Sequence, residues 1–254
     1  MEKIIEVKEL CREYVTYKGV IHRRKEVVQA VRGIDFTVQR GEIFGLLGQN
    51  GAGKTTTIKM LTTLLAPTSG ICKVFGYDTF REEKRIRKRI NFIFGGELGV
   101  YRRLSAEDNL RYFANLYRMD VKERECRIKD ILELVELTDA ADRLAETYSK
   151  GMIQRLQIAR GLINDPELLF MDEPTVGLDP LGAHMLRDLI RKLRDAGKTV
   201  LLTTHYLPEA EELCDRMAIL NHGKIVASGT PAEIRGEAES LEAAYIRLIK
   251  EAAV

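Results

Sequence analysis

The stretch Gly48-Gln49-Asn50-Gly51-Ala52-Gly53-Lys54-Thr55-Thr56 constrains the fold of this chain more than any other. It matches the pattern G-x-x-x-x-G-K-[ST], which forms a phosphate-binding P-loop where a strand leads into it and a helix follows it. The apolar run 43–47 before it is typical of a buried strand, and 57–63 after it is typical of a helix. The sequence therefore predicts a strand, a P-loop and a helix in succession.

The residue types of this loop suit a nucleotide. Glycines let the backbone curl so that successive N–H groups face inward, and the N-terminus of the following helix adds partial positive charge. In such a loop Lys54 reaches the β- and γ-phosphates of ATP, and the hydroxyl of Thr55 coordinates Mg²⁺. The alternative, a glycine-rich turn before an ordinary helix, is weak because the pattern arises by chance in roughly one chain of this length in a hundred. The residues predicted to contact the nucleotide are Gly48, Asn50, Gly51, Ala52, Gly53, Lys54, Thr55 and Thr56.

Composition excludes several classes of protein. The 254 residues suffice for one large α/β domain, and 40 Lys and Arg against 38 Asp and Glu give a net charge of +2, so nucleic acid is not the expected partner. No apolar run reaches the roughly 18 residues that span a bilayer, and the first residues lack a signal-peptide core, so we expect the protein to be made and kept in the cytoplasm. Four cysteines without a C-x-x-C pair are expected to be free and mostly buried: Cys11, Cys72, Cys126 and Cys214.

Apolar periodicity divides the chain into alternating strands and helices. Strands are expected at 4–14, 26–38, 43–47, 71–75, 90–94, 168–171, 199–203, 217–220 and 225–228, and helices at 57–63, 81–89, from 105, 121–137, 150–163, 181–196, 208–214 and 241–252. The helices after 105 predict an insertion, at about 97–160, in one α/β domain over 1–254. We expect a P-loop NTPase core with a mainly parallel sheet, an N-terminal antiparallel β subdomain and a C-terminal docking helix at about 239–252. The basic segment 18–26 is expected to be a solvated hairpin tip, with a contact to anionic lipid or a partner as the alternative.

Two adjacent carboxylates, Asp172 and Glu173, follow the apolar run 168–171. In a parallel sheet the carboxyl ends of the strands form the edge where ligands bind, so we expect this pair beside the P-loop. Asp172 can then hold the Mg²⁺ shell, and Glu173 can polarise a water for in-line attack on the γ-phosphate. The alternative is an acidic strand end in solvent.

The segment Tyr148-Ser149-Lys150-Gly151-Met152 lies at a predicted helix start. It resembles the signature motif of ATP-binding-cassette (ABC) transporter ATPases, usually L-S-G-G-Q, and the resemblance extends over nearly the whole chain. Ser149 and Gly151 match the motif, whereas the other three residues form a variant that is common among exporter-type ATPases. A serine hydroxyl and N–H groups at a helix N-terminus make an anion site. The resemblance implies that this site closes on ATP held by the P-loop of a second subunit.

Other family elements follow in order along the chain. The resemblance implies that Asp179, in Val176-Gly177-Leu178-Asp179, is the D-loop aspartate at the dimer interface, and that His205, after the strand 199–203, contacts the γ-phosphate. Tyr14 resembles the aromatic residue that stacks on adenine, with Tyr17 as a close competitor. The remaining histidines are interpreted as structural: His22, His184 and His222.

One family element is missing after the strand 90–94. The family places a glutamine there that senses Mg²⁺ and the attacking water, but this chain has Gly95-Gly96-Glu97. Glu97 is a candidate replacement, although a carboxylate near phosphate needs a cation to offset its charge. The surface at 95–103 is the expected docking site for a membrane partner.

The resemblance implies a specific function. Mg·ATP would close a dimer, either a homodimer or a pair with a paralogous ATPase subunit, and hydrolysis would reopen it. The motion would drive a separately encoded membrane-spanning permease at the cytoplasmic face of the membrane, with export favoured over import. Three alternatives are a regulatory subunit with poor hydrolysis, a soluble family member that acts on ribosomes or DNA, and a small-molecule kinase.

Overall fold

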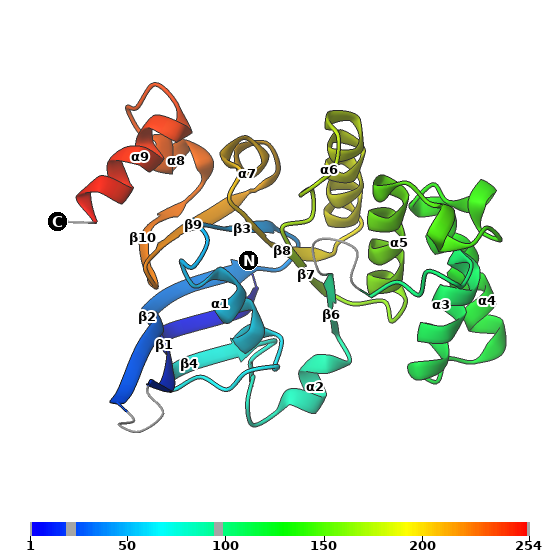
Figure 1. Ribbon diagram of the computed structural model, residues 1–254, viewed down its shortest axis with the longest axis horizontal. Coiled ribbons are helices and arrows are strands. Elements are labelled where there is room, and N and C mark those ends of the chain that lie inside the picture. The colour runs from blue at the N-terminus through cyan, green and yellow to red at the C-terminus, as the bar shows by residue number, and fades with distance from the viewer. Residues whose placement is uncertain (1, 19–23, 94–98, 253–254) are drawn as a thin grey trace. The chain divides into compact units, whose positions relative to one another are not determined.

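The computed structural model describes residues 2–18, 24–93 and 99–252, and the chain forms two compact units (Figure 1). Unit 1 comprises residues 1–87 and 201–254, and unit 2 comprises residues 88–200. The basic tip at 19–23, which includes His22, and the segment 94–98 lie outside the described residues. The strand β8 (Thr199–Thr204) runs from unit 2 into unit 1.

Unit 1 begins with an antiparallel sheet whose strand order is β2-β1-β4-β5. Its strands are β1 (Lys3–Lys18), β2 (Arg24–Gln39), β4 (Ser69–Val74) and β5 (Tyr77–Asp78). Pairing between β1 and β2 continues to Lys18 and Arg24, so both strands are longer than the expected 4–14 and 26–38. The prediction of a loop over 18–26 is therefore wrong at its two ends, because Val15, Thr16 and Tyr17 favour a strand and the ladder they form continues to the pair Lys18–Arg24.

The rest of unit 1 includes a central strand, β3 (Ile43–Leu47), all of whose residues are buried. It pairs in parallel with β9 (Arg216–Asn221), which forms an antiparallel hairpin with β10 (Lys224–Gly229). The helices are α1 (Lys54–Leu61), α2 (Glu83–Arg87), α7 (Leu207–Leu213), α8 (Pro231–Arg235) and α9 (Leu241–Glu251). The sequence pattern missed β5 and α8, whose lengths of two and five residues are too short to show a period.

Unit 2 combines the parallel strands β6 (Ile90–Ile93) and β7 (Leu168–Asp172) with helices. These are α3 (Ala106–Leu116), α4 (Val121–Leu134), α5 (Lys150–Leu162) and α6 (Pro180–Asp195), with short 3-10 turns at Thr138–Ala140 and Ala145–Thr147. The helix α4 ends earlier than the expected 137 because Glu136 has a left-handed backbone (φ +55°) and Leu137 N–H bonds back to Leu132 O. The expected α/β class, with an antiparallel N-terminal sheet and a helical segment, is confirmed.

Two further expectations concern single residue types and membrane spans. Cys72 and Cys214 are buried, but Cys11 is half-buried and Cys126 is exposed on α4, so the expectation of mostly buried thiols holds for only part of the set. All four thiols are free. Within 2–18, 24–93 and 99–252, every helix is too short or too polar to cross a membrane.

Candidate functional site

The predicted P-loop connects β3 to α1 in unit 1, and two of its glycines have no room for a side chain. A Cβ atom at Gly48 would lie 2.4 Å from the carbonyl oxygen of Leu220, and one at Gly53 would lie 2.6 Å from that of Ala30. Gly53 also has φ +110° and is the N-cap of α1, so the helix begins at Lys54 rather than at the expected 57. The order of strand, loop and helix agrees with a phosphate cradle, and so do the positions of the glycines.

Lys54 lies inside this loop. Its side chain is buried, and the Nζ atom donates to Gly48 O at 2.6 Å and to Gln49 O at 3.3 Å. The ammonium group of Lys54 lies next to the N-terminus of α1, whose first turn contains no acidic residue. This arrangement favours the binding of phosphate. The loop therefore fits the triphosphate of ATP.

The turn of the β9–β10 hairpin is hydrogen-bonded to the P-loop. The N–H of Gly223 donates to Ala52 O at 2.9 Å, and the N–H of Arg32 donates to Gly223 O at 2.8 Å, so this turn joins the loop to β2. Together with the contact of Leu220 at Gly48, these bonds hold the cradle in shape. The sequence predicted the hairpin at 217–228 but not its contact with the loop, because residue spacing carries no signal for such a long-range pairing.

Register along the β1–β2 ladder places Tyr14 closer to the P-loop than Tyr17. A bulge leaves Ala30 between the pairs Arg12–Val31 and Glu13–Gln29, and the carbonyl of Ala30 abuts Gly53. Tyr14 pairs with Val28, two residues or about 7 Å along β2 from Ala30, whereas the partner of Tyr17 is five residues or about 17 Å away. The Tyr14 ring also has the guanidinium carbon of Arg12 at 4.9 Å from its centroid.

The carboxylates follow the predicted apolar strand, at the end of β7 in unit 2. Asp172 is the last residue of the strand, and Glu173 follows it with a left-handed backbone (φ +49°). A non-glycine residue in this conformation is strained, and such strain concentrates at functional sites. Oxygen donors such as the Asp172 carboxylate and the Thr55 hydroxyl are the ligands that Mg²⁺ prefers, so these residue types fit that ion.

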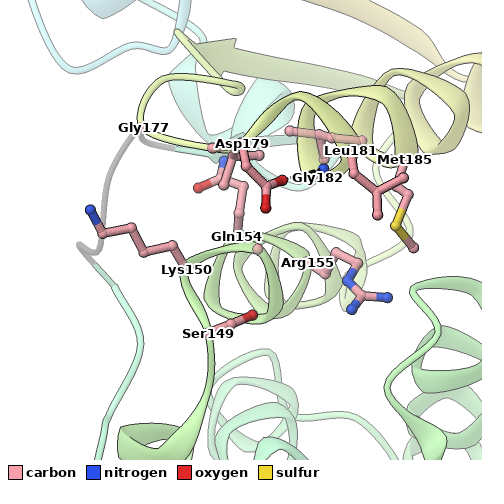
Figure 2. A pocket seen from close by; sticks show the side chains of 12 residues that line it. Ser149, Lys150, Gln154, Arg155, Gly177, Asp179, Leu181, Gly182 and Met185 are labelled. Carbon is pink, nitrogen blue, oxygen red and sulfur yellow. Dashed lines mark hydrogen bonds between the residues drawn. The ribbon is translucent and has the colours of Figure 1, made fainter.

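The signature segment forms a capped helix start. Ser149 is the N-cap of α5, and its Oγ accepts a hydrogen bond from Met152 N at 3.2 Å. A Cβ atom at Gly151 would meet only the Ser149 hydroxyl, at 3.9 Å, so the backbone there is accessible. Asp179 caps α6 in the same way, with Oδ1 accepting from Gly182 N at 2.6 Å. Both caps line one pocket of unit 2 (Figure 2).

The structure also places the predicted histidines. His205 directly follows β8 and is exposed, and the next residue, Tyr206, donates its N–H to Thr204 Oγ1 at 3.0 Å. His184 lies 3.4 Å from Asp188 on α6, and His222 forms the left-handed turn before Gly223. The substitution of Gly95-Gly96-Glu97 for the family glutamine lies outside the described residues.

The predicted site residues divide between the two units. Unit 1 contains Tyr14, Gly48, Asn50, Gly51, Ala52, Gly53, Lys54, Thr55, Thr56 and His205, and unit 2 contains Ser149, Gly151, Asp172, Glu173 and Asp179. Around these residues the order of strand, loop and helix agrees with the sequence prediction.

A family model described as ABC transporter matches residues 31–176, which include the P-loop, the signature segment and both carboxylates. The chain belongs to the ABC transporter family. It is 38% identical over 227 residues to the ABC transporter ATP-binding protein NatA of Bacillus subtilis, covering 89% of this chain and 92% of that protein. It is 44% identical over 207 residues to the daunorubicin/doxorubicin resistance ATP-binding protein DrrA of Streptomyces peucetius, covering 82% of this chain but only 62% of the length of DrrA.

A solved structure supports the same assignment. The ATP-binding cassette MJ0796, determined as a dimer in a post-hydrolysis state with ADP and Pi, matches with a TM-score of 0.75 and 27% identity over 89% of this chain and 98% of that chain. As a member of the ABC transporter family, the chain is an ATP-binding ATPase.

Proposed function

We propose that this chain hydrolyses Mg·ATP as one half of a dimer and drives export through a separately encoded membrane-spanning partner. Each ATP lies between the P-loop of one copy and the N-terminus of α5 of the other, in a homodimer or in a pair with a paralogous ATPase. The subunit works at the cytoplasmic face of the membrane. Export is favoured over import by the similarity to the drug-resistance protein DrrA.

The proposed roles follow from the chemistry of the side chains. Lys54 binds the β- and γ-phosphates, and Thr55 and Asp172 hold Mg²⁺, which neutralises phosphate charge when it is bound. Glu173 takes a proton from the attacking water. His205 orients the attack on the γ-phosphate.

The capped start of α5 is the observation that carries this proposal. An accessible serine hydroxyl and helix N-terminus, with no acidic residue in the first turn, form a second anion site. The P-loop belongs to unit 1 and already has its own lysine and helix N-terminus. The chain therefore has a second anion site that its own P-loop does not need. This second site has a role if it binds the phosphates of the nucleotide held by another copy.

Complementation between two inactive chains tests this arrangement. We expect Ser149→Arg to spare ATP binding by the isolated subunit but to block hydrolysis, because the larger cationic side chain obstructs the site of the second copy. Mixed in equal amounts with a Lys54→Ala chain, it should recover roughly a quarter of the parental rate, since half of the dimers are mixed and each of these has one intact site. Phosphate release measures the outcome.

The control for complementation is each inactive chain alone at the total concentration of the mixture. A mixture that stays as inactive as its components would contradict sites shared between chains. Loss of ATP binding in isolated Ser149→Arg would also contradict it, since the residue would then serve its own P-loop.

The position of Tyr14 along the β1–β2 ladder leads to a prediction for the adenine contact. We expect Tyr14→Ala to raise the KM for ATP by about tenfold with little change in kcat, because stacking on an aromatic ring stabilises a bound base. Tyr17→Ala is the matched control and should leave both constants unchanged. Steady-state ATPase kinetics distinguish them, and a larger KM effect for Tyr17→Ala would reverse the assignment.

The described part of the expected docking surface presents aromatic side chains. Tyr101, 47% exposed, contacts Tyr112 edge to face with ring centroids 4.9 Å apart. The buried Asn109 holds this loop, accepting from Tyr101 N at 2.8 Å and donating to Tyr101 O at 3.0 Å. Exposed aromatic rings on a fixed loop favour a protein contact, which supports the proposed membrane partner.

A further inference from the structure

Arg12 and Tyr14 lie on the same face of β1, because alternate residues of a strand point to the same side of its sheet. The guanidinium carbon of Arg12 lies over the Tyr14 ring, 4.9 Å from the ring centroid. A cation in this position is attracted to the ring and restricts its movement. An aromatic ring has two faces, so the guanidinium covers one face of Tyr14 and leaves the other for a second planar group.

The face of β1 that carries this pair is the one directed toward the P-loop and α1, which lies against β2 and β4 (Figure 1). Arg12 pairs with Val31 on β2, and directly opposite residues of an antiparallel pair share a face of the sheet. A Cβ atom at Gly53 would lie 3.5 Å from Cγ2 of Val31, so this face adjoins the start of α1. Arg12 also reaches the segment after α1, where its Nη1 atom donates to Ala66 O at 2.9 Å.

Two other hydrogen bonds already attach the segment after α1 to β1. The N–H of Thr68 donates to Cys11 O at 2.9 Å, and the hydroxyl of Thr68 accepts from Glu13 N at 3.0 Å. The Nε atom of Arg12, by contrast, is buried and makes no hydrogen bond to any residue that the structure describes. A buried donor without a partner lowers stability, and an unbranched apolar side chain would avoid this cost. Stability alone therefore does not explain an arginine at this position, whereas its contact with the Tyr14 ring does.

The positive charge of Arg12 also suggests a competing role, which is attraction of the nucleotide phosphates. Lys54 and the N-terminus of α1 already supply positive charge at the P-loop. The guanidinium of Arg12 instead lies over an aromatic ring and donates to a main-chain carbonyl. Tyr14 is half-buried, so part of its ring stays accessible. These contacts favour support of a stacked base over a direct contact with phosphate.

We propose that Arg12 is a positioning residue for the adenine base of ATP. Its guanidinium covers one face of the Tyr14 ring and keeps the ring in the orientation in which the other face stacks on adenine. A ring that is already held before the nucleotide arrives loses little conformational entropy on binding, so the base is bound more tightly. This inference rests on the proposed contact between Tyr14 and adenine, and it adds the residue that fixes the ring.

A double-mutant cycle in steady-state ATPase kinetics tests this role. We expect Arg12→Met to raise the KM for ATP by about threefold to fivefold with little change in kcat, because the Tyr14 ring loses its support. In a chain that already carries Tyr14→Ala, the same substitution should leave the KM at the value set by Tyr14→Ala. If Arg12 instead attracted phosphate or only stabilised the fold, Arg12→Met would raise the KM by the same factor in both backgrounds.

Arg85→Met is the matched control. The guanidinium carbon of Arg85 lies 5.1 Å from the ring centroid of Tyr77, in the same kind of pair, but Tyr77 belongs to β5, two strands from β1 in the sheet. This control should leave the KM and kcat unchanged. A KM that Arg12→Met leaves unchanged, that Arg85→Met raises equally, or that rises by the same factor in both Tyr14 backgrounds would overturn the role of Arg12 alone. A parental KM in Tyr14→Ala would overturn the adenine contact itself.

Discussion

Replacing Glu173 with glutamine is expected to lower kcat for ATP hydrolysis by at least about a hundredfold, the scale of a lost general base. Glutamine keeps the size of the side chain and an oxygen acceptor, but it cannot take a proton from water. The affinity for ATP should stay within about twofold of the parent value, because the proposed phosphate contacts come from the P-loop. Phosphate release and equilibrium nucleotide binding measure the two effects separately.

The control for this substitution must share the unusual backbone. Glu136→Gln provides it, since Glu136 has a similar left-handed conformation at the end of α4 and lies outside the predicted site. An ATPase rate that Glu173→Gln leaves unchanged would contradict the role of Glu173 as a base. A parent rate already as low as that of the variant would favour the alternative of a regulatory subunit with poor hydrolysis.

Lys54→Ala is expected to weaken ATP binding by about tenfold to a hundredfold and to reduce turnover further. A hydrogen bond from a charged donor contributes about 1.5–3 kcal/mol, and the same cation also stabilises charge that develops on the γ-phosphate oxygens. Nucleotide titration gives the loss of affinity, and phosphate release at saturating ATP gives the loss of rate. The truncation also removes two hydrogen bonds to the loop, at Gly48 O and Gln49 O, so thermal unfolding should accompany both measurements.

Lys59→Ala provides the matched control for this prediction. Lys59 is an exposed lysine in the last turn of the same helix, so its removal changes the net charge equally without touching the loop. Equal losses in both variants would indicate a general effect of charge. Unchanged affinity and rate in Lys54→Ala would show that the cradle is misassigned.

Local chemistry made the conformation of several candidate site segments predictable from sequence. The P-loop, the end of β7 and the start of α5 are each set by a few adjacent residues: glycines that need special φ angles, an apolar run that ends in carboxylates, and a serine that caps a helix. Their functional grouping depended on resemblance to a family, because a P-loop and a strand that ends in carboxylates occur in many P-loop enzymes with different functions.

The missed features depend on residues far apart in the chain. The hydrogen bond between Gly223 and Ala52 and the bulge at Ala30 arise only when strands and loops pack together. The early start of α1 has a similar origin, since Gly53 is held against Ala30 of β2. The periodicity of apolar residues shows which face of a helix or strand is buried, but not which element packs against that face. Such contacts can therefore be found only in the structure.

The bond between Gly223 and the P-loop has a consequence for biosynthesis. During translation the P-loop leaves the ribosome long before β9 and β10, and until then it lacks the hydrogen bond to Ala52 O and the packing of Leu220 against Gly48. A nascent chain that ends before 216 has the complete nucleotide-binding sequence without the contacts that shape it. We therefore expect capture of ATP to follow the synthesis and folding of the β9–β10 hairpin.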